Sequence, residues 1–271
     1  MVNIGGTNNN ERRGLSFIVF VAIIGFSVAR AIATFFTNYL WFDSVNLNSV
    51  WLKILLTKGA LVGATSLLAF VFIFTNLRFA VRATPVMDIF ESFESQDPLS
   101  RFRAWTNERF SRYRLLGSIG LSLFLGAGAS QLWEQVLLFL NQHNFGVNDP
   151  VFQADVSRYV FGLPLYRLFV SWGFQLVIFT SLIILLFFVA TGALQLRQGR
   201  LPEVSSGAKA HLSVLLAFIA ILKAFAYRLD SMELLYSSRG KVFGASYTDV
   251  VAHLPALNLL ILISLFGAVL L

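Results

Sequence analysis

The chain has 271 residues, of which 56% are hydrophobic and 13% are charged, and its mean hydropathy is +0.71. These values are typical of integral membrane proteins and exclude an ordinary water-soluble globular domain. The net charge of +7 does not indicate nucleic-acid binding, because the basic residues lie beside apolar stretches, where they set topology and meet lipid headgroups. The sequence contains no cysteine, which excludes disulfides, thiolate nucleophiles and Cys-ligated clusters.

The chain begins with a polar tail, residues 1–14, that we expect to be flexible and cytoplasmic. The apolar run from Leu15 to Leu40 then predicts the first membrane span, and residues 15–271 as a whole are predicted to form one helical transmembrane domain. Ala31 and Ala33 offer the small-x-small pattern of a signal-peptide cleavage site. The apolar run is longer than the usual signal-peptide core of about 7–15 residues, which favours an uncleaved span.

Small residues recur at four-residue spacing in the second and third predicted spans. The second span runs from about Ile54 to Leu77, and its Gly59 and Gly63 form a small-xxx-small pair that lets another helix approach closely. Such a pair also arises by chance in a helix rich in Gly and Ala. The third span, Leu115–Leu132, carries a longer stripe at i, i+4 spacing that predicts close helix packing. The stripe consists of Ser118, Ser122, Gly126 and Ser130.

The polar connection from Arg78 to Arg114 divides at Pro98 into two amphipathic pieces. The first places apolar side chains opposite acidic ones at helical spacing. The second interleaves basic and aromatic residues, which suits the anionic headgroups of the inner leaflet, although a solvated topology determinant has the same composition. The residues predicted to contact lipid headgroups are Arg101, Arg103, Arg109, Arg112 and Arg114.

The segment 133–167 is more apolar than a free loop, and Leu137, Leu138 and Leu140 predict a helix lying on the outer face of the membrane. Twelve Lys and Arg residues fall in the predicted inner segments and six in the outer loops, so the positive-inside rule places the N-terminus in the cytoplasm. The expected fold is an all-α, polytopic helical protein of the cytoplasmic membrane, with six spans plus interfacial amphipathic helices. The remaining three spans are Leu168–Leu194, His211–Tyr227 and Leu254–Leu271.

All 14 acidic residues fall outside the cores of the predicted spans. This weakens the case for an ion- or proton-coupled carrier, which usually places carboxylates near the membrane midplane. Arg30 and Lys223 are the most deeply placed cations. They either snorkel to the surface or pair with carboxylates at the same level, for which the candidates are Asp43, Glu134, Asp230 and Glu233.

The three histidines are His143, His211 and His253. They share no metal-ligand spacing and no carboxylate completes a zinc site, so no metal site is predicted. Each can serve as an axial ligand to haem or a chlorophyll-type pigment, but an interfacial polar role is the commoner use of such a histidine. The sequence shows no Gly-rich phosphate loop, nucleophile elbow or carboxylate pair. We therefore predict no catalytic residue and no enzymatic activity, and the cofactor stays open.

Two outer-loop motifs give the chain a resemblance to a known family. The motifs are Asp149-Pro150-Val151-Phe152 with the later Tyr159-Val160-Phe161-Gly162-Leu163-Pro164, and Gly244-Ala245-Ser246-Tyr247-Thr248-Asp249-Val250 before Leu254-Pro255. Leu40-Trp41-Phe42 and segment 76–85 are also similar, so the resemblance covers nearly the whole chain. The chain resembles uncharacterised protein family 0182, bacterial integral membrane proteins without an established activity. This resemblance implies about seven spans followed by a large extracytoplasmic region.

Three hypotheses of function follow. The first is an accessory or scaffold subunit that packs with lipids and other membrane protein subunits in a larger assembly. The second is a transporter or channel component, suggested by Pro150 and Pro164 in the outer segment, and the third is a pigment- or haem-binding membrane subunit. The last apolar run, Leu254–Leu271, is shorter than the roughly 20 residues that a span needs. We therefore expect the polypeptide to continue to a seventh span and an extracytoplasmic domain.

Overall fold

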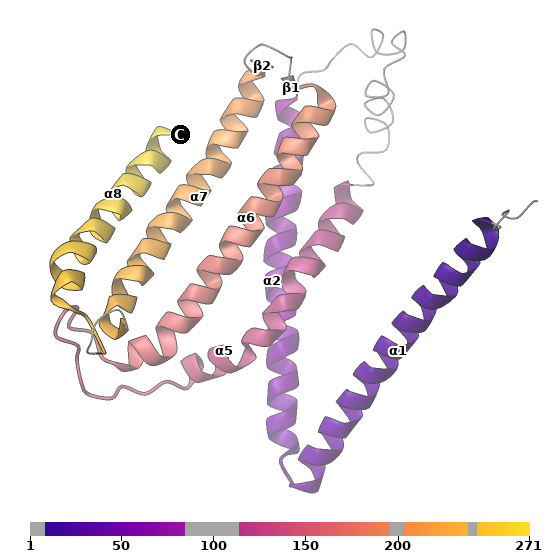
Figure 1. Cartoon of the computed structure of the whole chain (residues 1–271), viewed down its shortest axis with the longest axis horizontal. Helices are drawn as coiled ribbons and strands as arrows, with labels where there is room; N and C mark the ends of the chain where they lie inside the picture. The colour runs from indigo at the N-terminus through magenta and orange to yellow at the C-terminus, as the bar shows by residue number, and fades with distance from the viewer. Residues whose placement is uncertain (1–8, 85–113, 196–202, 238–242) are drawn as a thin grey trace, which may run out of the picture. The chain divides into compact units, whose positions relative to one another are not determined.

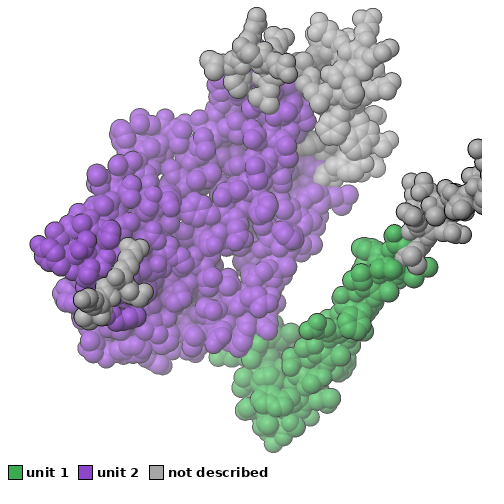
Figure 2. Space-filling view, in the orientation of Figure 1, with its two compact units in different colours: residues 1–56 green, residues 57–271 purple. Residues whose placement is uncertain are grey.

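The structure is a computed structural model that describes residues 9–84, 114–195, 203–237 and 243–271. The chain divides into two compact units, Met1–Leu56 and Thr57–Leu271, which Figure 2 shows in different colours. Part of the predicted headgroup-contacting set lies outside the described residues, namely Arg101, Arg103, Arg109 and Arg112.

Unit 1 is a helical hairpin made of α1 (Asn9–Ser44) and the first turns of α2 (Asn48–Ala83), as Figure 1 shows. Asn46 in the connecting turn has a φ of 57°, a left-handed conformation that asparagine tolerates better than most residues. Trp51 of α2 packs edge-on against Phe35 of α1, with ring centroids 5.2 Å apart. Within unit 1, the described part of α1 buries none of its apolar side chains.

Unit 2 contains the rest of α2 and the elements that follow it. A helix over 114–127 continues through the 3₁₀ turn η1 into α5, and the π-helical turns η2 and η4 lead into α6 and α8. Neighbouring helices α6, α7 and α8 alternate in direction, as Figure 1 shows. The bounds are η1 Gly128–Leu132, α5 Trp133–Leu140, η2 Arg158–Gly162, α6 Leu163–Thr191, β1 Leu194–Gln195, β2 Glu203–Val204, α7 Ser206–Glu233, η3 Leu234–Tyr236, η4 Asp249–His253 and α8 Leu254–Leu270.

Six helices in the described part of the chain are long and apolar enough to cross a membrane, which confirms the predicted fold class. Each overlaps one predicted span, and the second, third and fifth extend well beyond it, as does the fourth at its start, since flanking polar residues also satisfy their backbone groups in a helix. The antiparallel strands β1 and β2 between α6 and α7 were not predicted. The six helices are Ser16–Ser44, Asn48–Ala83, Arg114–Leu140, Arg158–Thr191, Ser206–Tyr236 and Asp249–Leu270.

The π-helical turns η2 and η4 have the same local cause. In each, the amide of a leucine that precedes a proline bonds the carbonyl five residues earlier: Leu163 bonds Arg158, and Leu254 bonds Asp249. Proline lacks an N–H, and in a regular α-helix its ring clashes with the carbonyl four residues before it. The wider turn makes room for the ring, so both helices enter the bundle through the same proline-adapted geometry.

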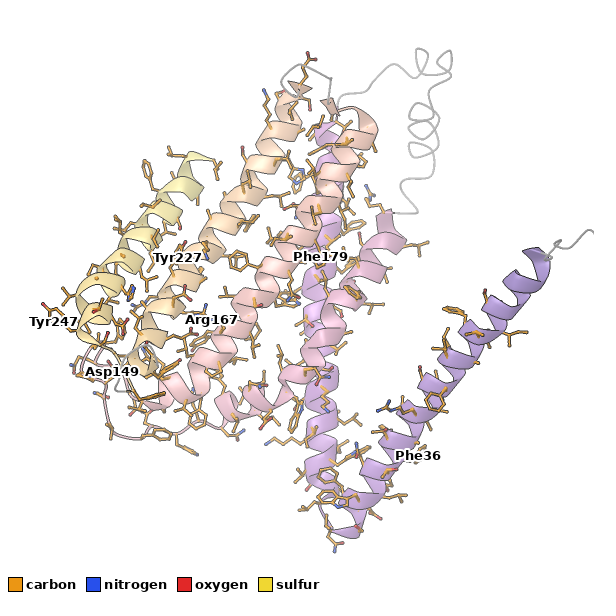
Figure 3. The ribbon with its side chains drawn as sticks, in the orientation of Figure 1. Phe36, Asp149, Arg167, Phe179, Tyr227 and Tyr247 are labelled. Atoms are coloured by element: carbon orange, nitrogen blue, oxygen red, sulfur yellow. The ribbon has the colours of Figure 1, made fainter. Side chains whose placement is uncertain are left out.

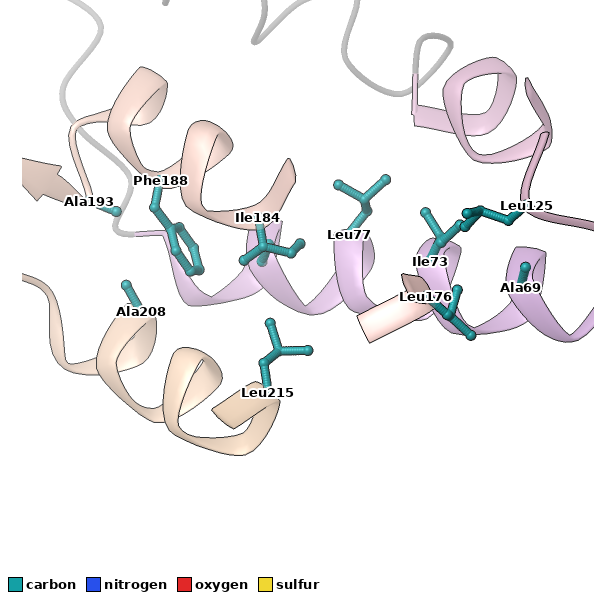
Figure 4. Packing of buried hydrophobic residues seen from close by; sticks show 11 residues of the cluster. Ala69, Ile73, Leu77, Leu125, Leu176, Ile184, Phe188, Ala193, Ala208 and Leu215 are labelled. Carbon is teal, nitrogen blue, oxygen red and sulfur yellow. The ribbon is translucent and has the colours of Figure 1, made fainter. Parts of the chain in front are cut away.

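The core of unit 2 is apolar and lies between α2, α6 and α7. Ile184 and Phe188 of α6 are fully buried and belong to one cluster with Ile73 of α2 and Leu215 of α7. Figure 4 shows these side chains gathered from the three helices. Within a membrane, lipid tails are as apolar as these residues, so the cluster stabilises the bundle by close packing rather than by removal from water.

The helix over 114–127 packs against α2 through small residues. Gly126 lies so close to α2 that a Cβ at this position would be 2.0 Å from Ser66 Oγ and 2.9 Å from Ser66 Cα. Ser118 and Ser122, from the same predicted stripe, are buried, and Ser130 is partly exposed. The backbones therefore meet closely at Gly126, where any larger side chain would force them apart.

The start of the unit 2 portion of α2 has a different environment. A Cβ added at Gly59 or Gly63 would meet no atom within 4 Å, so a helix partner for this glycine pair stays a prediction. The ammonium group of Lys58 lies 5.4 Å from the centroid of the Trp133 ring, at the start of α5. Basic and aromatic side chains of this kind are common at membrane–water interfaces.

Candidate functional site

Both family-like motifs lie at one end of unit 2, which we call the motif end. It comprises loop 141–157, η2, η3, residues 243–248 and η4. Figure 3 labels Asp149, Arg167 and Tyr247 at this end. The site is therefore assembled from the segments that lead into α6 and α8 and the segment that leaves α7.

Asp149 is the centre of loop 141–157 and is 7% exposed. One carboxylate oxygen accepts the amides of Val151 and Phe152 at 2.8 and 2.6 Å, and the other accepts the amide of Ala154 at 3.0 Å and the Tyr159 hydroxyl at 2.6 Å. Burial raises the pKa of Asp149, but the hydrogen bonds from Tyr159 and the three amides outweigh it, so the pKa lies below its ordinary value. The carboxylate is ionised and fixes the loop.

Asp155 closes the same loop from its other side. Its carboxylate accepts the amides of Phe145, Gly146 and Ser157 at 3.1, 2.9 and 2.9 Å. Gly146 has a φ of 74°, a conformation in which glycine meets no Cβ penalty. The hydrogen bonds from Ser157 and the two loop amides lower the pKa of Asp155 to about 2. Its charge is therefore present at every physiological pH and holds Phe145 in place.

Asp249 plays the corresponding part in the second motif and is 1% exposed. One of its oxygens accepts the Ser246 amide at 3.0 Å and the Ser246 hydroxyl at 2.8 Å, and the other lies 2.8 Å from His253 Nδ1. A carboxylate can only accept here, so Nδ1 carries a proton and His253 donates. Asp249 therefore ties the segment before η4 to His253 at the end of η4.

Several large apolar side chains of the two motif loops are exposed, while the carboxylates of Asp149 and Asp249 are buried. Phe145 and Val147 are 50% and 60% exposed, and Phe243 and Tyr247 are 77% and 83% exposed. A loop facing water normally has the opposite arrangement, with carboxylates outside. Rigid loops that expose aromatic side chains are suited to contact with another apolar or interfacial surface.

An ion pair joins α6 to α7 at this end. The Arg167 guanidinium lies 2.7 Å from Asp230 and 2.8 Å from Glu233. The sequence offered these two carboxylates as alternative partners of Arg30 or Lys223; the structure shows that both contact Arg167, which lies one helix away. The Lys223 ammonium instead lies 4.6 Å from the centroid of the Tyr227 ring. In the sequence, Arg167 is one of the six basic residues of the predicted outer loops, and that count says nothing of its partners.

A groove of about 510 Å³ opens between the adjoining ends of α7 and α8. One part of its lining is polar and another is apolar. The polar residues are Asp230, Glu233, Tyr236, Ser237 and His253, and the apolar residues are Leu234, Ala256, Leu257 and Leu260.

The three histidines do not converge. His143 is exposed in loop 141–157, whereas His211 lies on α7 with its Nε2 3.0 Å from Asn76 Oδ1 of α2 and its ring against Phe188. His253 belongs to the motif end. Among the residues that the structure describes, no three His, Cys, Asp or Glu side chains are placed to hold a metal ion. Haem or pigment binding at a single histidine stays a prediction, which an absorption spectrum of the purified protein checks.

Arg114 is the one predicted headgroup contact that the described residues include. Its guanidinium carbon lies 5.1 Å from the centroid of the Phe74 ring of α2. This cation–π contact attaches the start of the third span to α2. Contact between Arg114 and lipid headgroups stays a prediction.

Comparison with known proteins finds relatives over nearly the whole chain. The family described as Uncharacterised protein family (UPF0182) matches residues 15–271. A UPF0182 protein of Salinispora tropica is 35% identical over 235 residues, which are 86% of this chain and 23% of the relative. A UPF0182 protein of Mycobacterium tuberculosis is 36% identical over 240 residues, 86% of this chain and 24% of the relative. The chain thus spans about a quarter of the length of these relatives, and no solved structure matches it.

Proposed function

Because the chain belongs to the uncharacterised family UPF0182 and covers only 23–24% of its curated relatives, we propose that it is the membrane scaffold domain of a larger assembly. In this proposal the six helices anchor the assembly in the bilayer. The motif end is a rigid platform on which an extramembrane part of the assembly docks. The observation that carries the proposal is the outward-facing set of aromatic side chains on loops that buried carboxylates hold rigid.

The platform is defined by Phe145, Val147, Phe243 and Tyr247, which are large, exposed hydrophobic residues of the two motif loops. Exposed aromatic residues are enriched at protein interfaces, where a preordered surface loses little conformational entropy on binding. The carboxylates that order these loops are already saturated with donors, which suits a structural role. The relatives contain polypeptide well beyond the matched stretch, which supplies a natural occupant for the platform.

The interior of unit 2 supports a scaffold better than a transporter or channel. The described cluster between α2, α6 and α7 is lined by apolar side chains such as Ile184 and Phe188, both fully buried. Transport sites of membrane carriers place polar or ionisable groups near the midplane. The ionisable groups described here lie mainly at the helix ends, and the well-ordered ones contact protein partners, as Arg167 does.

We also propose a cytoplasmic N-terminus and placement in the cytoplasmic membrane of a bacterium, which puts the motif end on the outer side. The excess of basic residues in the predicted inner segments supports this orientation. The cysteine-free chain allows a direct test with single cysteines at Ser95 and Ser238. An impermeant maleimide added to intact cells should label position 238 and not position 95, and the reverse result would overturn the orientation.

Native mass spectrometry tests the scaffold proposal. The protein should be released from its native membranes in mild detergent and its complexes weighed without harsh activation. We expect the domain to be found bound to a stoichiometric partner or joined covalently to further polypeptide. A matched sample in which Tyr247 and Phe243 are both changed to Ser should lose a non-covalent partner. A protein that runs as a lone monomer of this domain in both samples would refute the proposal.

A further inference from the structure

The groove between α7 and α8 combines charge, an aromatic ring and an apolar floor. We propose that it binds one membrane lipid whose headgroup carries a primary ammonium group, with the acyl chains lying along α8. This inference does not depend on the scaffold proposal, since it concerns the groove and not the exposed aromatic residues of the platform. Three properties of the groove carry it: the balance of charge, the order of polar and apolar residues, and the donors and acceptors at its polar end.

The described charges that meet at the polar end do not balance. Arg167 is one cation, and it contacts the carboxylates of both Asp230 and Glu233. Asp249 nearby is matched by His253 and by Ser246, so it offers little to a ligand. The two groove carboxylates are 37% and 40% exposed, which leaves them within reach of a ligand while Arg167 satisfies one oxygen of each. A second cation in the groove would therefore be attracted.

The order of residues along α8 matches an amphiphile. His253 lines the polar end, and the apolar residues Ala256, Leu257 and Leu260 follow it along the helix. At a helical rise of 1.5 Å per residue they lie about 4–11 Å beyond His253. A lipid bound here would place its headgroup beside the carboxylates and the start of its chains over the apolar part. A free metal ion or a small polar amine would leave that part uncovered.

The hydrogen-bonding groups favour a primary ammonium over a quaternary one. A primary ammonium has three N–H donors, which the outer oxygens of Asp230 and Glu233 can accept. The Tyr236 ring also lines the groove and can face the cation. A quaternary ammonium has no N–H and is held in proteins by cages of several aromatic rings. Tyr236 is the one Phe, Tyr or Trp residue in the described lining, so phosphatidylethanolamine should bind in preference to phosphatidylcholine.

Binding can be measured on the whole purified chain after delipidation. Native mass spectrometry would titrate it with phosphatidylethanolamine or phosphatidylcholine of identical acyl chains. We expect one phosphatidylethanolamine to bind about tenfold more tightly than phosphatidylcholine. Glu233→Gln should abolish most of this preference, whereas Tyr236→Leu should weaken the binding of both lipids and leave the preference in place. Equal binding of the two lipids by the unmodified chain would overturn the proposal.

A steric variant keeps the test valid if Glu233→Gln weakens the ion pair that joins α6 to α7. Leu257→Trp fills the groove without touching its charges, whereas Leu259→Trp places the same bulk on an exposed face of α8 outside the groove. Both proteins should unfold at similar temperatures. The first should lose the preferred lipid and the second should keep it. Retention by both variants would show that the lipid binds elsewhere and would contradict the assignment.

Discussion

The core of unit 2 and the motif end are ordered by different forces. The core contains apolar side chains such as Phe188 and Ile184, and close contact between helices is its main source of stability. The motif end is ordered by Asp149, Asp155 and Asp249, each of which accepts several donors. The comparison teaches that apolar packing is the main force that holds the helices together in the core, whereas the shape of the exposed loops depends on a few ionised carboxylates. Substitutions in the two regions should therefore fail in different ways.

The largest effect is expected in the core. Phe188→Ala removes a fully buried ring and leaves a cavity among three helices, and it should lower the free energy of unfolding by about 4 kcal/mol. Titration with SDS in a mild detergent, followed by helix content, measures this change. Phe179, on the same helix and 40% exposed, is the matched control: Phe179→Ala should change the free energy little. Equal losses for the two variants would show that α6 is not packed as described.

The next largest effect is expected at Asp149. Asp149→Asn keeps the shape of the side chain but directs an amide NH₂ at groups that already donate. It should therefore destabilise the folded loop by about 3 kcal/mol. The loss should be local: hydrogen exchange should increase in loop 141–157 while the core stays protected. Asn148→Ala, one residue earlier on the exposed side, is the comparison variant. If loop 141–157 and the core lost protection at the same denaturant concentration, the two regions would not be independently ordered.

A smaller effect is expected where α2 meets the third span. Gly126→Ala places a Cβ 2.0 Å from Ser66 Oγ and close to its backbone, so the helices must move apart, at a cost of about 2 kcal/mol. Gly120→Ala, in the same helix but with no atom within 4 Å of the added Cβ, should be neutral or slightly stabilising. Unfolding curves of the two variants should therefore separate. A neutral Gly126→Ala would show that the contact is looser than described.

The smallest effect concerns pH at Asp155. Its pKa is about 2 in the folded loop against an ordinary 3.8, so its stabilising contribution is complete above pH 3.8 and is lost as pH falls toward 2. The amides of Phe145 and Gly146 should therefore exchange faster with solvent across that window, after correction for intrinsic rates. In Asp155→Asn these amides should already exchange fast at neutral pH and respond little to acid. An unchanged rate in the unmodified chain would mean that the carboxylate does not hold the loop.

Apolar periodicity and length were enough to predict the six helices, because a membrane span must satisfy its own backbone hydrogen bonds. The motif end could be located from its resemblance, but its chemistry could not be derived. Asp149 and Asp249 stand 100 positions apart in the sequence, and only the fold shows that both are buried with their donors. Arg167 was misjudged for the same reason: charge counting records its side of the membrane but not the two carboxylates opposite it.

The central claim is that another part of a larger assembly covers the motif end, and cysteine labelling tests it most directly. A single cysteine in place of Tyr247, 83% exposed, would be the only thiol in the chain. It should react with an impermeant maleimide at least about tenfold more slowly in native membranes than in the purified chain reconstituted into the same lipids. Cysteine at Ser238 serves as the reference. Equal reactivity of position 247 in the two preparations would contradict the account. Both preparations contain the same lipids, so equal reactivity would mean that no further part of the assembly covers this position.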